Sequence, residues 1–284
     1  MMSQAHIFDF HAHAFPDRIA AKAMAALEAT YQVPSHSDAT LSGLRRAMAA
    51  AGIGHSVVLP VATSPAQVRS ITDWAAREQA QGDSEQSRGA AAGAAPDLTI
   101  FGSLHPEMDD PGAEITRMRE LGIRGVKFHS EFQGFHPDDE RVFPIYQALG
   151  DAGMIVFFHA GNEIMPLPVI RATPGRIAAV LDAFPGLTVI AAHMGSYLQW
   201  DEVWEFLVGR EIHFDTAFCL HKLGTHRFVD LVRAHGAQRV LFGTDSPWAD
   251  QGEALTSLRA LPLTDDERRL ILRENAQRLL GNRA

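Results

Sequence analysis

Eight short apolar segments alternate with segments of helical period along this 284-residue chain, and this alternation limits the possible folds more than any other feature. The apolar segments are residues 8–13, 55–61, 99–104, 124–129, 154–159, 187–193, 211–215 and 239–244. Strands that alternate with helices form parallel sheets, and continuous apolar runs are typical of strands covered on both faces. Eight such units in a chain of this length predict an α/β fold, a (β/α)8 TIM barrel with extra N- and C-terminal helices.

A doubly wound open sheet is the alternative architecture for this pattern. Such a sheet often carries a glycine-rich phosphate loop after its first strand, whereas this chain has His11-Ala12-His13-Ala14 there. Residues 80–96 are low in complexity and lack large apolar side chains, so we predict a flexible insertion there. Because the same alternation resumes beyond it, we expect residues 1–284 to form a single domain.

Composition and charge exclude several classes of function. The net charge of −9 argues against a nucleic-acid partner, because binding phosphates requires a basic surface. No apolar run reaches the roughly 18 residues that a membrane span needs, and we see no signal peptide. The single cysteine, Cys219, cannot form an intramolecular disulfide, which favours a cytoplasmic location. We expect a small-molecule substrate and no membrane partner, and a homo-oligomer is compatible with the sequence.

The first predicted strand ends in two histidines, His11 and His13, which are separated by one residue. Side chains two residues apart in a strand point to the same face, so the two imidazoles converge on one place. Neutral imidazoles suit a divalent metal such as zinc. A pair of histidines in this spacing is also compatible with a packed core, so the rest of the chain has to supply the other ligands.

Polar side chains also end most of the other predicted strands, where a barrel carries its active site. They are His105, Lys127, His129, His159, His193 and Asp245, and Trp248 follows shortly after the last strand. A buried charge such as that of Asp245 has to be paired or to coordinate a metal. The pattern therefore predicts a metal site at the carboxyl ends of the strands.

These motifs resemble the amidohydrolase superfamily, in particular its amidohydrolase-related branch of metal-dependent TIM-barrel hydrolases and decarboxylases. The resemblance covers almost the whole chain and rests on five motifs and the C-terminal tail. They are Asp9-Phe10-His11-Ala12-His13, Gly125-Val126-Lys127-Phe128-His129, Phe158-His159-Ala160-Gly161, Ala192-His193-Met194-Gly195, Leu241-Phe242-Gly243-Thr244-Asp245-Ser246-Pro247-Trp248 and the tail from Glu274 to Gly281.

The resemblance implies roles for individual residues. The metal ligands would be His11, His13, His159 and Asp245, holding one or two divalent ions, with zinc the first expectation. His193 would assist proton transfer, polarise the substrate or bind a second metal. Asp245 would also take the proton of the attacking water.

Other residues keep more than one interpretation. Lys127 would be a carbamylated bridge between two metals, a group that binds a substrate carboxylate, or a structural ion pair with Glu131 or Asp9. Asp9 is expected to orient a ligand histidine or to pair with Lys127. The pocket candidates are His129, His105 and Trp248, each with loop packing or a turn as the alternative.

Three functions fit this set. The first is a metal-dependent hydrolase of a small amide, lactone or ester, with Asp245 and His193 as catalytic residues. The alternative is a metal-dependent non-oxidative decarboxylase of an aromatic or muconate-type acid, in which Lys127 would hold the carboxylate. A metal-dependent binding protein is the third, and the acid–base candidates argue against it.

Overall fold

The computed structural model describes residues 7–87 and 97–281, and all eight predicted strands are present in it. The strands are β1 (Phe8–Ala12), β2 (His55–Val58), β3 (Asp97–Ile100), β4 (Gly102–Ser103), β5 (Gly125–Phe128), β6 (Ile155–Phe158), β7 (Val189–Ala191), β8 (His213–Asp215) and β9 (Val240–Leu241). The third predicted strand is divided at Phe101 into β3 and β4. All pairings between neighbouring strands are parallel, as the alternation predicted.

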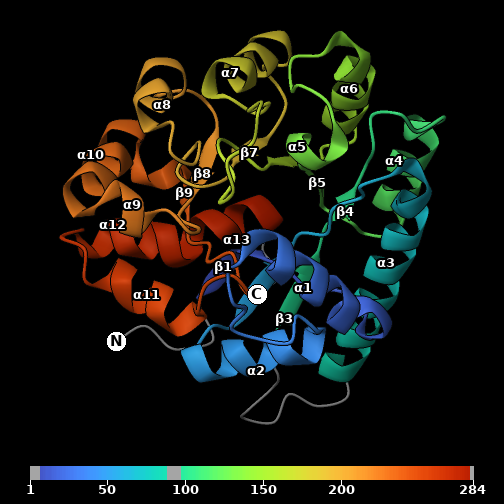
Figure 1. The fold of residues 1–284 in the computed structure, drawn as a ribbon, viewed down its shortest axis with the longest axis horizontal. Helices are drawn as coiled ribbons and strands as arrows, with labels where there is room; N and C mark the ends of the chain where they lie inside the picture. The colour runs from blue at the N-terminus through green and yellow to red at the C-terminus, as the bar shows by residue number, and fades with distance from the viewer. Residues whose placement is uncertain (1–6, 88–96, 282–284) are drawn as a thin grey trace.

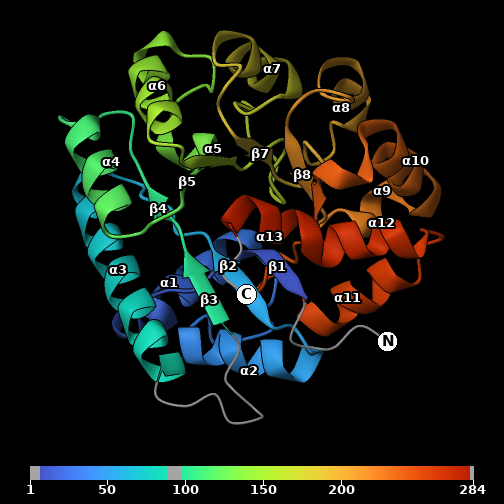
Figure 2. The same ribbon diagram turned by 180° about the vertical axis from the view of Figure 1, so that it is seen from behind.

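The strands follow one another around the molecule in the order of the sequence. One sheet has the order β1-β2-β3 and the other β4-β5-β6-β7-β8-β9. On the edge of β1 that does not pair with β2, the Phe10 amide donates to the Phe242 carbonyl at 2.7 Å and the Asp245 amide donates to the His11 carbonyl at 2.8 Å. These bonds join β1 to the chain that follows β9, so first and last strands are neighbours (Figures 1 and 2). The fold is a (β/α)8 barrel rather than an open sheet.

The helices lie outside the strands in Figure 1. They are α1 (Asp17–Tyr31), α2 (Leu41–Ala51), α3 (Pro65–Ser87), α4 (Pro111–Glu120), α5 (Ser130–Gln133), α6 (Phe143–Asp151), α7 (Pro174–Ala183), α8 (Trp200–Phe206), α9 (Leu220–Leu223), α10 (Thr225–His235), α11 (Gln251–Arg259), α12 (Asp265–Arg269) and α13 (Asn275–Leu280). A π-helical stretch, Leu270–Glu274, joins α12 to α13. Thr264 and Glu267 form the capping box that begins α12.

Helix α3 continues to Ser87, into the segment that the sequence predicted to be flexible from residue 80. Flexibility of the insertion stays a prediction, and its first eight residues, 80–87, are the C-terminal end of α3. The next part of the predicted insertion, residues 88–96, lies outside the described residues.

Buried apolar side chains form two layers, one inside the barrel and one between the strands and the helices. Inside the barrel, Phe10, Phe101, Phe157, Ile190 and Leu241 belong to one packed cluster. A larger cluster fills the space between strands and helices. Strand side chains alternate between these two layers. The polar groups at the carboxyl ends of the strands therefore border the apolar interior of the barrel. None of the helices in residues 7–87 and 97–281 is long and apolar enough to cross a membrane.

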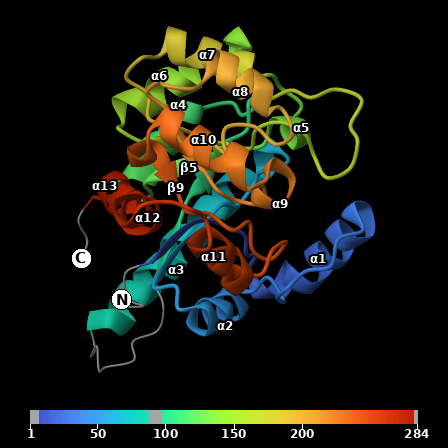
Figure 3. The same cartoon turned by 90° about the vertical axis from the view of Figure 1, so that its left-hand side faces the viewer.

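Helix α1 extends away from the barrel in Figure 3, on the same side as the loop between β6 and α7. Of the fifteen residues of α1, only Ala20 and Met24 are buried. The loop exposes Ile164, Met165 and Val169. Leu27 and Tyr31 of α1 and Ile164 of the loop line the same cavity, so these two segments flank its entrance.

Candidate functional site

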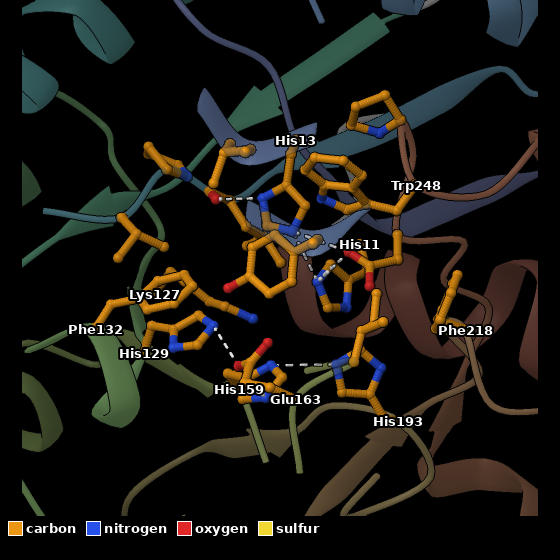
Figure 4. A pocket seen from close by; sticks show the side chains of 18 of the residues that line it. His11, His13, Lys127, His129, Phe132, His159, Glu163, His193, Phe218 and Trp248 are labelled. Carbon is orange, nitrogen blue, oxygen red and sulfur yellow. Dashed lines mark hydrogen bonds and ion pairs between the residues drawn. The ribbon is translucent and has the colours of Figure 1, made fainter. Parts of the chain in front are cut away.

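A cavity of about 210 Å³ opens at the carboxyl ends of the strands. Aromatic side chains form much of its wall: Phe15, Tyr31, Phe132, Tyr197, Phe218 and Trp248. Eight of the predicted site residues also line it: His11, His13, Lys127, His129, His159, His193, Asp245 and Trp248. Figure 4 shows most of these side chains directed toward one another. The structure therefore brings together every predicted site residue except His105.

Three of these side chains form a compact group that we call the β1–β9 cluster: His11, His13 and Asp245. The Nε2 atoms of the two histidines are 3.2 Å apart. Asp245 Oδ1 is 3.4 Å from His11 Nε2 and 3.0 Å from His13 Nε2. Three donor atoms thus face a single point at nearly equal mutual distances.

Both imidazoles of this cluster are fixed from behind. His11 Nδ1 lies 2.8 Å from Asp215 Oδ2, and His13 Nδ1 lies 2.9 Å from the Leu59 carbonyl oxygen. Since a carboxylate and a carbonyl only accept hydrogen bonds, each Nδ1 must carry the proton. In the neutral rings the lone pair is then on Nε2, the atom that faces the other donors. A metal-ligating histidine has the same arrangement.

The backbone around His11 allows this close approach. Gly243 lies against His11, and a Cβ atom at that position would come within 2.9 Å of the His11 Cβ atom. Asp245 has a φ of 69°, which turns its side chain out of the strand direction. Asp9 accepts hydrogen bonds from the His11 amide at 3.1 Å and from the Thr244 amide at 3.0 Å. A buried carboxylate therefore ties the two segments of the cluster together.

The charges of the cluster suit a cation. Burial, and then the nearby Lys127, hold the pKa of His11 well below its usual value, so this ring is neutral. Burial alone would raise the pKa of Asp245, but the imidazoles of His11 and His13 keep it well below its usual range. A neutral imidazole, as at His11, and an ionised carboxylate, as at Asp245, are the forms in which these groups bind metals.

His193 and His159 extend the group toward the next strands. His193 Nδ1 lies 2.9 Å from the Ala217 carbonyl oxygen, so Nδ1 carries the proton and Nε2 is free to accept. His193 Nε2 is 3.3 Å from His159 Nδ1. Burial, followed by the neighbouring His159, lowers the pKa of His193. The free nitrogen of His193 therefore faces both His159 and the cavity.

A second group, which we call the β5–β6 cluster, contains His129, His159 and Glu163. Glu163 Oε1 is 3.1 Å from His129 Nε2 and 3.0 Å from His159 Nε2. The rings of His129 and His159 are stacked, with centroids 4.2 Å apart and planes 6° apart, and Phe132 stacks on His129 at 3.8 Å. Ring lone pairs lie in the ring plane, and nearly parallel planes do not meet nearby. This trio is therefore poorly shaped to hold one metal ion through both histidines.

Lys127 is the cation of the pocket. It projects from β5 and is 1% exposed, and its Nζ atom makes no hydrogen bond with residues 7–87 or 97–281. Nζ lies 4.3 Å from the centre of the Phe157 ring, which provides a cation–π contact. Burial lowers the pKa of Lys127 to about 8, and the charges of Asp215, Asp245 and Glu163 oppose the shift. Asp9 and Glu131, which the sequence suggested as ion-pair partners, are engaged elsewhere by other donors.

The comparison with known families is decisive at this point. The Amidohydrolase model (Amidohydro_2) matches residues 8–281, nearly the whole chain. This chain belongs to the Amidohydrolase family.

Solved structures share the fold of this amidohydrolase at low sequence identity. A TIM-barrel protein from Bordetella bronchiseptica is 22% identical, with a TM-score of 0.70 and coverage of 97% of this chain and 98% of the other. A candidate 2-pyrone-4,6-dicarboxylic acid hydrolase from Pseudomonas putida is 19% identical, with a TM-score of 0.62 and 99% coverage of each chain. A 5-carboxyvanillate decarboxylase variant from Novosphingobium aromaticivorans, with bound manganese, is 17% identical, with a TM-score of 0.69 and coverage of 98% and 97%. A search of curated proteins finds no significant match.

Three residues of the candidate site were absent from the sequence prediction: Asp215, Glu163 and Tyr31. Asp215 ends β8, one of the two predicted strands, with residues 55–61, at whose ends no site residue was proposed, and this gap was a usable signal. Glu163 follows His159 by four residues in a loop, and Tyr31 ends α1, so no strand pattern indicates either of them.

Two predicted residues lie elsewhere than expected. His105 is buried, but it accepts a hydrogen bond from the Glu107 amide and does not line the cavity, in agreement with the turn that the sequence offered as the alternative. Asp9 contacts the backbone of His11 and not its ring, and its other partners are Thr244 and Gln251. The carboxylate that orients the His11 ring is Asp215.

Proposed function

We propose that this protein is a metal-dependent hydrolase of a small neutral carbonyl compound, an amide, ester or lactone. The observation that carries the proposal is the β1–β9 cluster, in which three ligand atoms converge while the opposite ring nitrogens are hydrogen-bonded. The cavity beside it is small and largely aromatic, which suits a compact organic molecule.

The spacing of the ligand atoms fits a divalent ion. With metal–ligand distances of about 2.0–2.1 Å, neighbouring ligands of a tetrahedral zinc ion are about 3.3 Å apart. The three separations within the cluster are 3.0, 3.2 and 3.4 Å. We assign His11, His13 and Asp245 as ligands of a zinc ion. We place His159 beside them through Nδ1, because that atom faces His193 and not Glu163.

A divalent ion in this position would supply Lewis-acid activation of a water molecule and of the substrate carbonyl. Asp245 would accept the proton of the attacking water, since its carboxylate is ionised and borders the cavity. The Lys127 ammonium would stabilise the negative charge that develops on the carbonyl oxygen. His193 presents an unprotonated Nε2, so in its neutral form it would accept a proton or bind an ion, and it would not act as an acid.

A neutral substrate agrees with the charges of the pocket. Glu163 places a second carboxylate in the wall, and its side chain is 8% exposed. A substrate carboxylate placed beside Glu163 would be repelled in this poorly solvated space. Amides, esters and lactones avoid this cost.

Decarboxylation is the second candidate. It is favoured by Lys127, a buried cation that has no hydrogen-bond partner in the part of the chain that the structure describes and could hold a substrate carboxylate. Decarboxylases among the proteins that share the fold are compatible with it. In that case Lys127 would bind the reacting group, and His193 or Asp245 would first take a proton from water and then pass it to the carbon that loses CO2.

The experiment has two parts. Metal analysis of the purified protein is expected to give one or two divalent ions per chain, with loss of activity on chelation and recovery on adding zinc. A panel of amides, esters and lactones is then compared with aromatic acids assayed for CO2 release. Full activity in a metal-free protein would refute the proposal, whereas CO2 release without hydrolysis would establish the second candidate.

A further inference from the structure

Three aromatic rings from three separate elements meet at the cavity. The ring of Tyr31, the last residue of α1, has its centroid 6.3 Å from that of Phe132 and 6.1 Å from that of Trp248. All three side chains line the cavity, and Figure 4 shows Phe132 and Trp248 on opposite sides of it. Tyr31 therefore bridges the pocket between these two rings, at separations typical of aromatic contacts.

The two neighbours of Tyr31 belong to different sides of the site. Phe132 stacks on His129 of the β5–β6 cluster. The Trp248 amide donates to the Asp245 carbonyl at 2.9 Å, which fixes Trp248 beside the β1–β9 cluster. Because Tyr31 contacts both rings, it covers the space between the two clusters, into which a molecule bound to the proposed metal ion would extend.

The space that these rings enclose is small. The cavity measures about 210 Å³, whereas sites for drug-sized molecules measure roughly 300–1,000 Å³. A molecule with one ring or a short chain fits such a volume. A second ring requires the wall to move, and overfilling a packed site costs free energy. The position of Tyr31 in the wall therefore decides how long a ligand the site accepts.

Helix α1 is attached to the barrel mainly at its ends. Before the helix, the Phe15 amide donates to the Ala39 carbonyl at 2.8 Å, and after it the His36 amide donates to the Pro247 carbonyl at 2.8 Å. Only two of its fifteen residues are buried. These bonds set the Tyr31 ring over the cavity, and the few buried residues mean that a change at Tyr31 leaves the core of the barrel intact.

We propose that Tyr31 is a specificity-determining residue, whose ring closes the cavity over the metal site and limits the substrate to a carbonyl compound with one ring or a short chain. This inference rests on the proposed function and adds a size limit to it. A substrate with a second ring in line with the first would collide with the Tyr31 ring. Specificity of this kind comes from a clash with the wrong substrate and not from an added contact with the right one.

Three zinc-binding probes of increasing length test this proposal: acetohydroxamate, benzohydroxamate and 4-phenylbenzohydroxamate. They share the group that chelates the ion and differ in carrying a methyl group, one ring or two rings in line. Dissociation constants are measured by calorimetric titration of the zinc-loaded protein. In the wild type we expect the two-ring probe to bind at least about tenfold more weakly than the one-ring probe, because it overfills the cavity.

Variants of Tyr31 separate the ring from its hydroxyl group. Tyr31→Ala removes the ring, so the two-ring probe should bind at least as tightly as the one-ring probe, while acetohydroxamate keeps its wild-type affinity. Tyr31→Phe keeps the ring and should retain the wild-type ranking. Ile19→Ala is the control, because Ile19 is an exposed apolar residue of α1 that does not line the cavity. This variant should also rank the probes as the wild type does.

The proposal is overturned if the wild type binds the two-ring probe as tightly as the one-ring probe, if Tyr31→Ala keeps the wild-type ranking, or if Tyr31→Phe loses it. Thermal unfolding of each variant shows whether it is folded, and Tyr31→Leu, which also removes the ring, carries the test if the Ala variant is not. Zinc titration of the same samples keeps the two proposals apart. Zinc binding without discrimination between the probes refutes the role of Tyr31 alone, whereas absence of zinc binding refutes the proposed function.

Discussion

The β1–β9 and β5–β6 clusters contain the same groups, two histidines and one carboxylate, at similar separations. They differ in what lies behind the imidazoles. In the β1–β9 cluster, Asp215 and the Leu59 carbonyl each hold the far nitrogen, so that both near nitrogens point at one place. In the β5–β6 cluster the two rings are stacked, and both Nε2 atoms face the same carboxylate oxygen, Glu163 Oε1, at 3.1 and 3.0 Å.

This difference shows that proximity of potential ligands does not by itself define a metal site. Direction decides, and direction comes from the outer hydrogen bonds. In the β1–β9 cluster the ligand atoms of the two histidines and the carboxylate converge, as a bound ion requires. In the β5–β6 cluster the parallel rings direct their Nε2 atoms at Glu163, so the cluster forms part of the cavity wall.

The largest expected effect comes from a matched pair of substitutions, His13→Ala and His129→Ala, one in each cluster. His13→Ala removes a proposed ligand, so zinc affinity should fall by more than the roughly 10–100-fold that loss of an orienting residue causes. His129→Ala should change zinc affinity by less than about threefold, since the stacked ring does not point at the ion. Calorimetric titration of zinc into each variant, after its metal has been removed with a chelator, measures the two affinities. An equal loss in the two variants would mean that the clusters are parts of one metal site.

A smaller effect is expected from Asp215→Asn, which tests whether the outer hydrogen bond defines the site. The Asp215 carboxylate accepts from His11 Nδ1, from the His193 amide and from the Ala217 amide. With an amide there, the hold on the His11 ring weakens, and zinc affinity should fall about 10–100-fold while the protein stays folded. Glu114→Gln is the control, because Glu114 is a buried carboxylate of α4 that pairs with Arg117 and does not line the cavity. If zinc affinity is unchanged in Asp215→Asn, convergence in the β1–β9 cluster does not depend on that bond.

The sequence was sufficient for the parts that strands specify. Side-chain alternation placed His11 and His13 on one face, and equivalent strand ends brought Lys127, His159, His193 and Asp245 to one cavity. All eight predicted strands are present in the structure, and they could be predicted because their apolar runs are short and sharply bounded.

What the sequence could not supply depends on loops and on direction. Glu163 reaches the cavity because Gly161 and Asn162 anchor a loop whose course no periodicity encodes. Asp9 and Asp215 are both buried carboxylates at strands, and only the three-dimensional arrangement shows that Asp215 orients the His11 ring while Asp9 binds its backbone. Stacking of His129 on His159 likewise arises from β5 and β6 being adjacent, with their last residues paired.

The smallest expected effect concerns the loss of folding stability at acid pH, and it separates the contribution of a histidine outside the cavity from that of the two clusters. His235 of α10 does not line the cavity; its ring stacks on Phe214 at 3.9 Å, and its Nε2 lies 2.9 Å from the Ile212 carbonyl oxygen. Its Nδ1 accepts from the Gly209 amide at 3.3 Å, so protonation of the ring would break this bond. Burial lowers the pKa of His235 to about 4, from 6.5.

A lowered pKa means that the unfolded state binds the proton more tightly, so this stabilisation is complete above pH 6.5 and is lost as the pH falls toward 4. Between pH 8 and pH 5.5 the loss is about 1.4 kcal/mol, or roughly tenfold in the unfolding equilibrium. Urea unfolding of the metal-free protein should show this decrease, and His235→Gln should remove that part of it. His226→Gln, an exposed change on the same helix, should retain the wild-type dependence. If His235→Gln leaves the decrease intact, the acid sensitivity originates in other groups, and the histidines of the two clusters become the first to test.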